Sequence, residues 1–337
     1  MSGYKSLKRI IHRCCEEIDA TLKIAKVTSW REAITTFQAK LDIQIMNHNG
    51  FKEPSEVERH LKQKHNTMLK YYETTCGDFF ASYDYDREII EDDPEFRNCI
   101  WTCWWQGIES APLVVKKCIN SIIKSSGHHK VIIITEDNYK NYTHIPEWIE
   151  IKKKEGIISR THFSDILRLS LLAEHGGMWL DSTFFCAGNC NLDDYFKYPL
   201  WSIKRPDYLH CSVASGYFAT YSLQCGYENR WMFATMRDFF LYYWETNNIL
   251  IDYLTLDYMI VLAQKHDERI AQEFSAIVPN NPECDELYKA LGAVYDREKW
   301  DELSENTALF KLTWKQDFPE TQNGLETFYG RILGGKL

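Results

Sequence analysis

The spacing of hydrophobic positions changes near residue 98, and this change divides the chain into two regions. In the first region apolar residues recur every three or four positions, which is typical of amphipathic helices; they include Leu7, Ile10, Ile11, Cys14, Ile18, Leu22 and Ala25. A further helix is predicted to begin at Pro54-Ser55, where Ser55 and Glu58 have the spacing of a capping box. The pattern therefore predicts a helical extension over residues 1–96, serving membrane or acceptor approach and carrying no chemistry.

In the second region short, continuous apolar runs alternate with amphipathic segments. Residues 99–105 and 130–135 are apolar and β-prone, and residues 112–123 between them have helical spacing. Strand, helix and strand at this distance predict a βαβ unit with a buried parallel sheet. Residues 97–337 are thus predicted to form one α/β domain. Its further expected strands are 178–180, 200–204, 211–219 and 310–314, and its further expected helices are 145–149, 159–175, 231–244, 250–263 and 283–291.

Residues 159–181 of this domain carry three charged side chains whose positions indicate a binding site. Asp165 and Arg168 are three positions apart, so they share one face of the helix predicted over residues 159–175. Gly176-Gly177 fits the end of that helix, and the apolar run that follows predicts a core strand ending at Asp181. Ligands of open α/β sheets bind at the carboxyl ends of strands. An acid there, beside an Asp/Arg pair, suits a ligand with hydroxyl and phosphate groups.

Composition narrows the class of protein. The chain has 337 residues, 45% of them hydrophobic, and a net charge of -9, which argues against a nucleic-acid partner. It has 11 cysteines without a CxxC pair, no metal-type spacing among its histidines and no run of about 18 apolar residues. These features predict a reduced cytoplasmic protein. The first segment is locally basic, with Lys5, Lys8, Arg9 and Arg13. Two interpretations of this segment remain: it makes peripheral contact with the inner face of the membrane, or it is the solvated face of an ordinary helix.

Two strings carry a resemblance to a known family. SDILRLSLLAEHGGMWLDST, at residues 164–183, and IWTCWWQG, at residues 100–107, resemble the capsular polysaccharide synthesis glycosyltransferases. These are DXD-type sugar transferases with a GT-A fold, related to glycosyltransferase family 32 and more distantly to the glucosylating clostridial toxins. The resemblance extends from about Ile100 to Cys186 and more weakly to Lys315. It implies a GT-A-like (Rossmann-like) domain that transfers a hexose from a UDP-sugar to a lipid-linked oligosaccharide or other glycan acceptor in capsule or surface polysaccharide synthesis, with retention of configuration.

The resemblance also implies roles for individual residues. Trp104 would stack on uracil, and Asp165 and Arg168 would bind the donor, although core packing and a structural ion pair remain the alternatives. Asp181 would contact ribose and a divalent metal, Mn or Mg. The chain departs from the family pattern because Thr183 replaces the second acid. A hydroxyl is a weaker ligand for a hard cation than a carboxylate, so we expect a weakly bound metal at Asp181 and Thr183 that arrives with the nucleotide.

Other candidates are implied with lower specificity. Residues 310–315 resemble the loop that closes over the diphosphate. Four cationic side chains are candidates for neutralising the diphosphate, namely Lys204, Arg205, Lys311 and Lys315. The alternative is that they are ordinary solvated side chains. Asn229 matches a position near the donor sugar. Asp252 and Asp257 precede or begin a predicted helix, where they serve catalysis, acceptor binding or helix-dipole stabilisation; we favour Asp257. The predicted catalytic set is Asp165, Arg168, Asp181 and Asp257.

Two other functions remain open at this point. Thr183 is compatible with a non-catalytic nucleotide-sugar binding protein that has kept the fold and lost the metal. A toxin-like transferase acting on a protein acceptor is the third possibility, and the absence of an export signal argues mildly against it.

Overall fold

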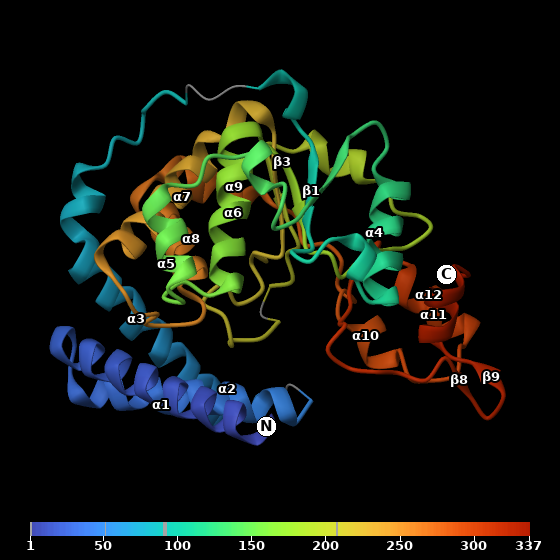
Figure 1. Cartoon of the computed structure of the whole chain (residues 1–337), viewed down its shortest axis with the longest axis horizontal. Helices are drawn as coiled ribbons and strands as arrows, with labels where there is room; N and C mark the ends of the chain where they lie inside the picture. Colours follow the sequence, from blue (N-terminus) through green and yellow to red (C-terminus); the bar gives the residue numbers. More distant parts are fainter. Residues whose placement is uncertain (1, 51, 90–92, 207) are drawn as a thin grey trace.

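The computed structural model describes residues 2–50, 52–89, 93–206 and 208–337, with the side chains of residues 2–13 left outside that description (Figure 1). Three long helices open the chain, as the periodicity predicts: α1 (Ser2–Val27), α2 (Trp30–His48) and α3 (Ser55–Ser82). The predicted capping box of α3 is wrong. Ser55 already lies inside the helix, and Pro54 at the cap position has no side-chain hydrogen bond to offer.

A five-stranded mixed sheet forms the centre of the molecule, in the order β2-β1-β3-β6-β5. The central strand β1 (Ile100–Cys103) pairs in parallel with β2 (Val131–Ile134) and with β3 (Gly177–Leu180). Helix α4 (Leu113–Ser125) connects β1 to β2, which confirms the predicted βαβ unit. Because the chain places β2 on one side of β1 and β3 on the other, the strand order reverses beside β1. Ligands of open α/β sheets bind at such a reversal of strand order, which here lies beside the carboxyl ends of β1 and β3.

The remaining two strands of the sheet run antiparallel. β6 (Ser222–Cys225) pairs with β3, and β5 (Leu200–Ser202) pairs with β6 at the edge. A separate ladder joins β4 (Phe184–Cys186) to β7 (Leu309–Lys311), and this ladder brings the end of the chain to the segment just after Asp181. The fold class is thus α/β with a central mixed sheet, compatible with a Rossmann-like domain.

Helix α6 (Arg160–His175) has the boundaries that the sequence predicts. Ser159 accepts a hydrogen bond from the His162 amide at the start of the helix, and Gly176 ends it with a positive φ of 64°. Gly177 also has a positive φ, and a Cβ at this position would lie 2.1 Å from the Cys99 carbonyl oxygen. Glycine is required there because β3 approaches β1 so closely at its first residue.

Three predictions of secondary structure need correction. Residues 211–219 form turns rather than a strand, because Gly216 (φ +80°) lies so close to the Arg205 carbonyl that only a sharp turn fits, and the strand lies later, at β6. The helix predicted from residue 250 begins at Thr255, since Asp252 accepts from the Leu254 amide in the preceding turn. The last strand ends at Lys311 rather than at residue 314.

The remaining helices and a short β-hairpin complete the fold. Their bounds are η1 Pro94–Phe96, η2 Ile108–Ser110, η3 Tyr139–Asn141, α5 Glu147–Lys154, η4 Leu192–Lys197, η5 Tyr227–Asn229, α7 Trp231–Thr246, α8 Thr255–His266, α9 Glu268–Ala276, α10 Glu286–Ala290, α11 Arg297–Ser304, β8 Thr321–Gln322, β9 Leu325–Glu326 and α12 Phe328–Gly334.

The third N-terminal helix is part of the main hydrophobic core. Met68, Tyr72 and Phe80 of α3 are buried in the same apolar cluster as residues of β1, α6, α7 and α8. On the same helix, the Lys64 ammonium forms an ion pair of 2.9 Å with Asp252 that is almost fully buried. Figure 1 shows α1 and α2 lying alongside each other at the far end of α3 from the sheet. Helix α3 is therefore integrated into the α/β body, and α1 and α2 join the same cluster through Ala20, Ile24 and Ala33.

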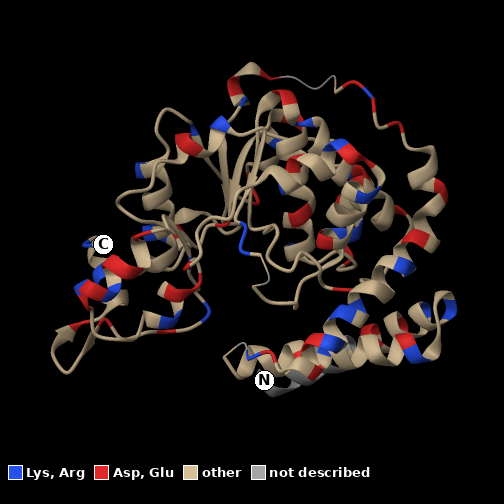
Figure 2. Ribbon diagram, turned by 180° about the vertical axis from the view of Figure 1, so that it is seen from behind, with Lys and Arg blue, Asp and Glu red and all other residues tan. Residues whose placement is uncertain are grey.

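Charged residues of both signs are spread over the helices (Figure 2). Among the described residues, no helix combines the length and the apolar character needed to cross a bilayer. The basic segment at Lys5, Lys8, Arg9 and Arg13 lies outside the described side chains.

Candidate functional site

Helix α6 and strand β3 bring three predicted residues together at the carboxyl edge of the sheet. An Arg168 Nη lies 3.2 Å from Asp165 Oδ1, one helical turn away, and 3.7 Å from Asp181 Oδ1 beyond the end of β3. The Arg168 guanidinium also donates to the Thr220 carbonyl and lies 5.1 Å from the centre of the Trp179 ring. Arg168 is thus held between two carboxylates, and the Asp/Arg pair predicted on one helix face is present.

Lys311 completes the cluster from the end of β7. Its ammonium donates to Asp181 Oδ2 at 3.0 Å and to Thr183 Oγ1 at 2.5 Å. The ladder between β4 and β7 explains this placement, because Lys311 is paired with Phe184, the residue next to Thr183. A cationic side chain therefore lies between the two residues for which the sequence predicts a metal.

The pKa values of the three acids Asp165, Asp181 and Asp257 are shifted in different directions by their surroundings. Burial raises the pKa of Asp165 to about 6 in spite of Arg168, and burial also raises the pKa of Asp257 to about 6, against a hydrogen bond of 2.7 Å from Ser212. Burial would raise the pKa of Asp181 as well, but Lys311 and Arg168 outweigh it and hold that pKa below its usual value. Asp181 is consequently the ionised acid, while Asp165 and Asp257 are poised to bind a proton near neutral pH.

These residues line one cavity of about 620 Å³. Asp165, Arg168, Asp181, Asp257 and Lys311 all contribute to its wall. Asn47, at the end of α2, contributes as well, so the N-terminal helices reach the cavity. The role of residues 1–96 in membrane or acceptor approach stays a prediction, and Asn47 is their contribution to this wall.

Trp104 lies at the same edge of the sheet but outside the lining of this cavity. It follows β1 directly, and its ring makes an edge-to-face contact with Trp314 at 5.4 Å between centroids. The indole nitrogen of Trp104 is buried without a hydrogen-bond partner among the described residues. Its stacking on a base stays a prediction, as does the role of Lys315, which is exposed four positions beyond Lys311.

Other candidates lie apart from the cluster. Asn229 is in η5, which follows β6, and the pairing of Cys225 with Gly177 places it near the start of β3, at the end opposite to Asp181. The Lys204 ammonium donates to backbone carbonyls of Phe274 and Ser275. The structure therefore does not bring Asn229 or Lys204 to the cluster.

Two further charged candidates have partners of their own. Arg205 lines the cavity, but its guanidinium is bound to Asp285 at 2.6 Å and to the Tyr221 hydroxyl at 2.9 Å. Asp252 is paired with Lys64 in the core. Of the two acids at the start of α8, the favoured one, Asp257, lies in the cavity and Asp252 does not.

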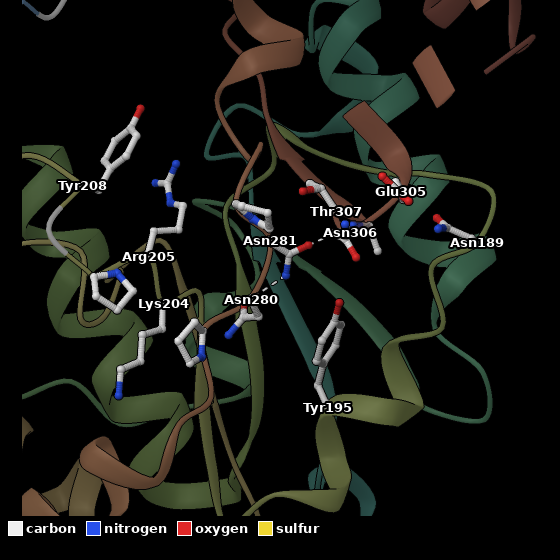
Figure 3. Close-up of a pocket in the computed structure, with 14 residues that line it drawn as sticks. Asn189, Tyr195, Lys204, Arg205, Tyr208, Asn280, Asn281, Glu305, Asn306 and Thr307 are labelled. Atoms are coloured by element: carbon white, nitrogen blue, oxygen red, sulfur yellow. Dashed lines mark hydrogen bonds between the residues drawn. The ribbon is translucent and has the colours of Figure 1, made fainter. Parts of the chain in front are cut away.

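A second cavity, of about 710 Å³, adjoins the first (Figure 3). Arg205 and Tyr208 belong to the walls of both cavities. Figure 3 shows Tyr195 on the opposite wall, with Asn280 and Asn281 between, while Lys204 points away from the asparagines. The larger cavity holds none of the clustered acids, so the chemistry is assigned to the smaller one.

A comparison with known families assigns the chain to one of them. The model of the capsular polysaccharide synthesis proteins matches residues 48–332, most of the chain. The chain belongs to the capsular polysaccharide synthesis protein family. The match begins at the end of α2, so the family's common region includes α3 and leaves α1 outside. Neither a curated protein nor a solved structure matches the chain. Membership in the capsular polysaccharide synthesis family indicates a role in capsule synthesis.

Sequence reasoning missed several residues that shape the site. The Trp179 indole donates to Asp181 Oδ1 at 3.0 Å; the two residues are two positions apart, and the alternation of a strand could have revealed that they share a face. Ser212, which binds Asp257, and Asn47 come from segments far away in sequence, and no local pattern marks them.

Proposed function

We propose that this protein is a retaining glycosyltransferase with a GT-A-like fold that transfers a hexose from a UDP-sugar to a lipid-linked oligosaccharide or other glycan acceptor in capsule synthesis. The observation that supports this most directly is the cluster of Asp165, Arg168, Asp181 and Lys311 in one cavity at the carboxyl ends of β1 and β3. Carboxylates accept hydrogen bonds from ribose and sugar hydroxyls, and the two cations match a diphosphate.

In the proposed reaction the bond between the sugar's anomeric carbon and the diphosphate oxygen breaks, and a bond to the acceptor oxygen forms on the same face. The departing phosphate takes the proton of the acceptor hydroxyl. Negative charge grows on the diphosphate as its bond breaks, and fixed positive groups stabilise that change. Arg168 and Lys311 are the cations of the cavity that lie nearest to Asp181. Asp257 is proposed to orient the incoming hydroxyl.

A divalent metal does not fit between Asp181 and Thr183 in this arrangement, because the Lys311 ammonium is bonded to both oxygens. Mg and Mn also prefer more oxygen ligands than one carboxylate and one hydroxyl supply. We therefore propose that Lys311 performs the charge neutralisation that a metal would otherwise supply, and no step is assigned to a metal.

The test begins with donor binding. The full-length protein is incubated with a panel of UDP-, GDP- and CMP-sugars, and the melting temperature is measured, because a ligand of the native state raises it. A shift with one UDP-sugar, followed by slow release of UDP from it, is the expected result. Release that is equal in Arg168→Ala, or shifts confined to other nucleotides, would contradict the proposal.

A nucleotide-sugar binding protein without turnover is the second candidate. Thr183 in place of an acid, already bonded to Lys311, favours it. It predicts a melting shift with a UDP-sugar and no UDP release, with or without glycan acceptors.

A further inference from the structure

A cluster of two histidines and an aspartate lies away from the cavity described above. His128 and His129 are in the turn between α4 and β2, and Asp193 is in η4, 65 positions from His128. His128 Nδ1 is 3.0 Å from Asp193 Oδ2, and His129 Nε2 is 3.5 Å from Asp193 Oδ1. One ligand atom from each of the three residues lies within 4.8 Å of the others. The turn directly precedes β2, so this cluster is at the amino end of that strand, whereas Asp181 follows the carboxyl end of β3, which runs in the same direction.

The tautomer of His129 is fixed by the backbone. Its Nδ1 lies 2.9 Å from the Asn98 carbonyl oxygen, which can only accept, so Nδ1 carries the hydrogen. In the neutral ring, Nε2 is then the nitrogen without a hydrogen. Nε2 then presents a lone pair toward the Asp193 carboxylate. Both His129 Nε2 and Asp193 Oδ1 are buried without a hydrogen-bond partner among the described residues. Two electron-rich atoms thus face each other with nothing positive between them.

The distances fit a small cation. In a tetrahedral shell with bonds of about 2.0–2.2 Å, neighbouring ligand atoms are about 3.3–3.6 Å apart. The separations of 3.5 Å and 3.0 Å bracket the lower end of that range, and the second requires only a small rotation of His128, which is 77% exposed. A backbone carbonyl bound to the second ring nitrogen is the usual support of a histidine metal ligand. Gly127 leaves room for the carboxylate, because a Cβ there would lie 2.1 Å from Asp193 Oδ1.

We propose that His128, His129 and Asp193 bind one Zn²⁺ ion, with water in the fourth position. Two imidazoles and one carboxylate suit zinc better than Mg or Ca, which prefer an all-oxygen shell. The ion would link the turn before β2 to η4 and so stabilise the edge of the sheet. The cluster lies away from the acids of the cavity, so the ion is given no part in the proposed transfer reaction.

Calorimetric titration of the full-length protein with Zn²⁺ tests this site. We expect about one equivalent to bind and the melting temperature to rise. Asp193→Asn and His129→Asn should each weaken binding at least about tenfold, the scale seen when even the supporting partners of a metal ligand are lost. In His129→Asn the shorter amide can still donate to Asn98, which separates ligation from local folding. His128→Ala, at an exposed position, is a third variant that should weaken binding without unfolding.

Thiols provide the main control, since Cys14 and Cys15 are exposed and adjacent. Replacing both by serine should leave the zinc equivalent unchanged. Asp181→Asn should also leave it unchanged, so failure of this site and failure of the proposed transferase are distinguishable. Zinc binding that persists in the Asp193 and His129 variants, or that disappears with the two cysteines, would overturn the proposal.

A second, independent observation concerns α2. Five large apolar side chains on this helix are 37–61% exposed, and they recur every three or four positions; they are Trp30, Ile34, Phe37, Leu41 and Ile45. A different face of the same helix is buried, through Ala33, Thr36, Ala39 and Met46. Helix α2 therefore has one apolar face packed in the protein and another facing solvent. A row of large apolar residues of this length marks an interaction surface.

Charge indicates what covers this α2 surface. From Trp30 to His48, all of them described, the exposed positions include Arg31 and His48 but no Asp or Glu. An amphipathic helix with apolar residues, a terminal Trp and no exposed acid suits the interface of an anionic bilayer. Asn47, in the last turn of α2, lines the cavity, so a bilayer under α2 would lie near its mouth.

We infer that the α2 surface docks on anionic lipid. Sedimentation with vesicles of phosphatidylcholine and phosphatidylglycerol should retain the wild-type protein, and Ile34→Glu/Leu41→Glu should lower binding about tenfold or more. Leu113→Glu, on an equally exposed apolar residue of α4, is the matched control and should bind normally. UDP release from a soluble donor should be unchanged in both. A wild-type protein that ignores vesicles, or a dimer that the double variant dissociates, would overturn this inference.

Discussion

Two groups of paired charges, one in the core and one in the cavity, differ in how completely their charges are paired. Lys64 and Asp252 are 1% and 2% exposed and face each other at 2.9 Å, as a closed pair in the core. In the cavity, Arg168 is shared between Asp165 and Asp181, and the side chains of Asp181 and Lys311 are 29% and 22% exposed. Asp165 and Asp257 there have pKa values raised to about 6. The first group stabilises the fold, whereas the second retains unsatisfied capacity that a ligand can use.

Removing one member of the closed pair should have the largest effect on stability. Lys64→Met leaves the buried Asp252 carboxylate without its ion-pair partner, and breaking such a pair typically costs about 3–5 kcal/mol. Chemical denaturation should show a loss of that size in the free energy of unfolding. The matched control is Lys62→Met on the same helix, because Lys62 is 55% exposed in its pair with Glu58, and its loss should change the free energy of unfolding far less. Equal losses in the two variants would show that the burial of the pair is not what stabilises α3.

Removing a member of the open cluster should instead affect turnover. Arg168→Ala is expected to lower UDP release about 10²–10³-fold, the scale for loss of one charge-stabilising donor in an active site. The circular dichroism spectrum should remain that of the wild type. Arg160→Ala, at the exposed start of the same helix, controls for general effects on α6. Near-normal turnover in Arg168→Ala would reassign the cluster to a structural role.

The comparison also shows what local sequence can reveal. The alternation of apolar runs and helical spacing was enough to predict α4, α6, β1, β2 and the strand that ends at Asp181, because each depends on its own residues and caps. The spacing of Asp165 and Arg168 likewise indicated a shared face. The sequence reading favoured Asp257 over Asp252, but it gave no sign that Lys64 pairs with Asp252. That pair depends on the packing of α3.

Long-range pairing explains the predictions that failed. Residues 211–219 are apolar enough for a strand, yet the close approach of Gly216 to Arg205 imposes turns. The position of Lys311 depends on the pairing of β4 with β7, which no periodicity encodes. The same holds for His128, His129 and Asp193: the histidines are adjacent, without metal-type spacing, and their third partner is distant in sequence.

The raised pKa of Asp257 predicts that this cavity residue, unlike the closed pair in the core, lowers the stability of the protein as the pH rises. The folded protein holds this proton up to about pH 6, while the unfolded chain releases it near the ordinary value of 3.8. The folded state therefore binds more protons between these values, and Asp257 costs stability as the pH rises from about 4 to above 6. Asp257→Asn should be more stable than wild type by about 1–3 kcal/mol at pH 7.5, on the scale of 1.4 kcal/mol per pKa unit.

Urea denaturation at pH 7.5 and at pH 5 measures this effect, and the advantage of Asp257→Asn should be smaller at the lower pH. Asp137→Asn, at an exposed position, is the control and should show no such trend. A variant that is less stable than wild type at pH 7.5 would show that Asp257 belongs with the closed pair.

Trp104, the residue predicted to stack on the uracil base, lies outside the lining of the cavity and can be tested separately. Trp104→Ala should weaken UDP binding by about 1–3 kcal/mol, the usual contribution of a base stacked on an aromatic ring. Trp104→Phe keeps an aromatic face and should retain most of the affinity. Calorimetry with UDP measures both variants. An unchanged affinity in Trp104→Ala would confine Trp104 to its contact with Trp314.

The smallest expected effect is that of a chelator on UDP release. Because the Lys311 ammonium is already bonded to Asp181 and Thr183, excess EDTA should leave turnover nearly unchanged. Lys311→Met removes the cation, and we expect it to lose turnover and to regain part of it with Mn, since Asp181 and diphosphate oxygens can then share a metal. The assay belongs in the Asp193→Asn background, where loss of zinc from the distant histidines cannot mimic an effect at the cavity. Activity of the wild type that falls with EDTA and returns only with Mn or Mg would place the metal at Asp181 and make Lys311 its competitor.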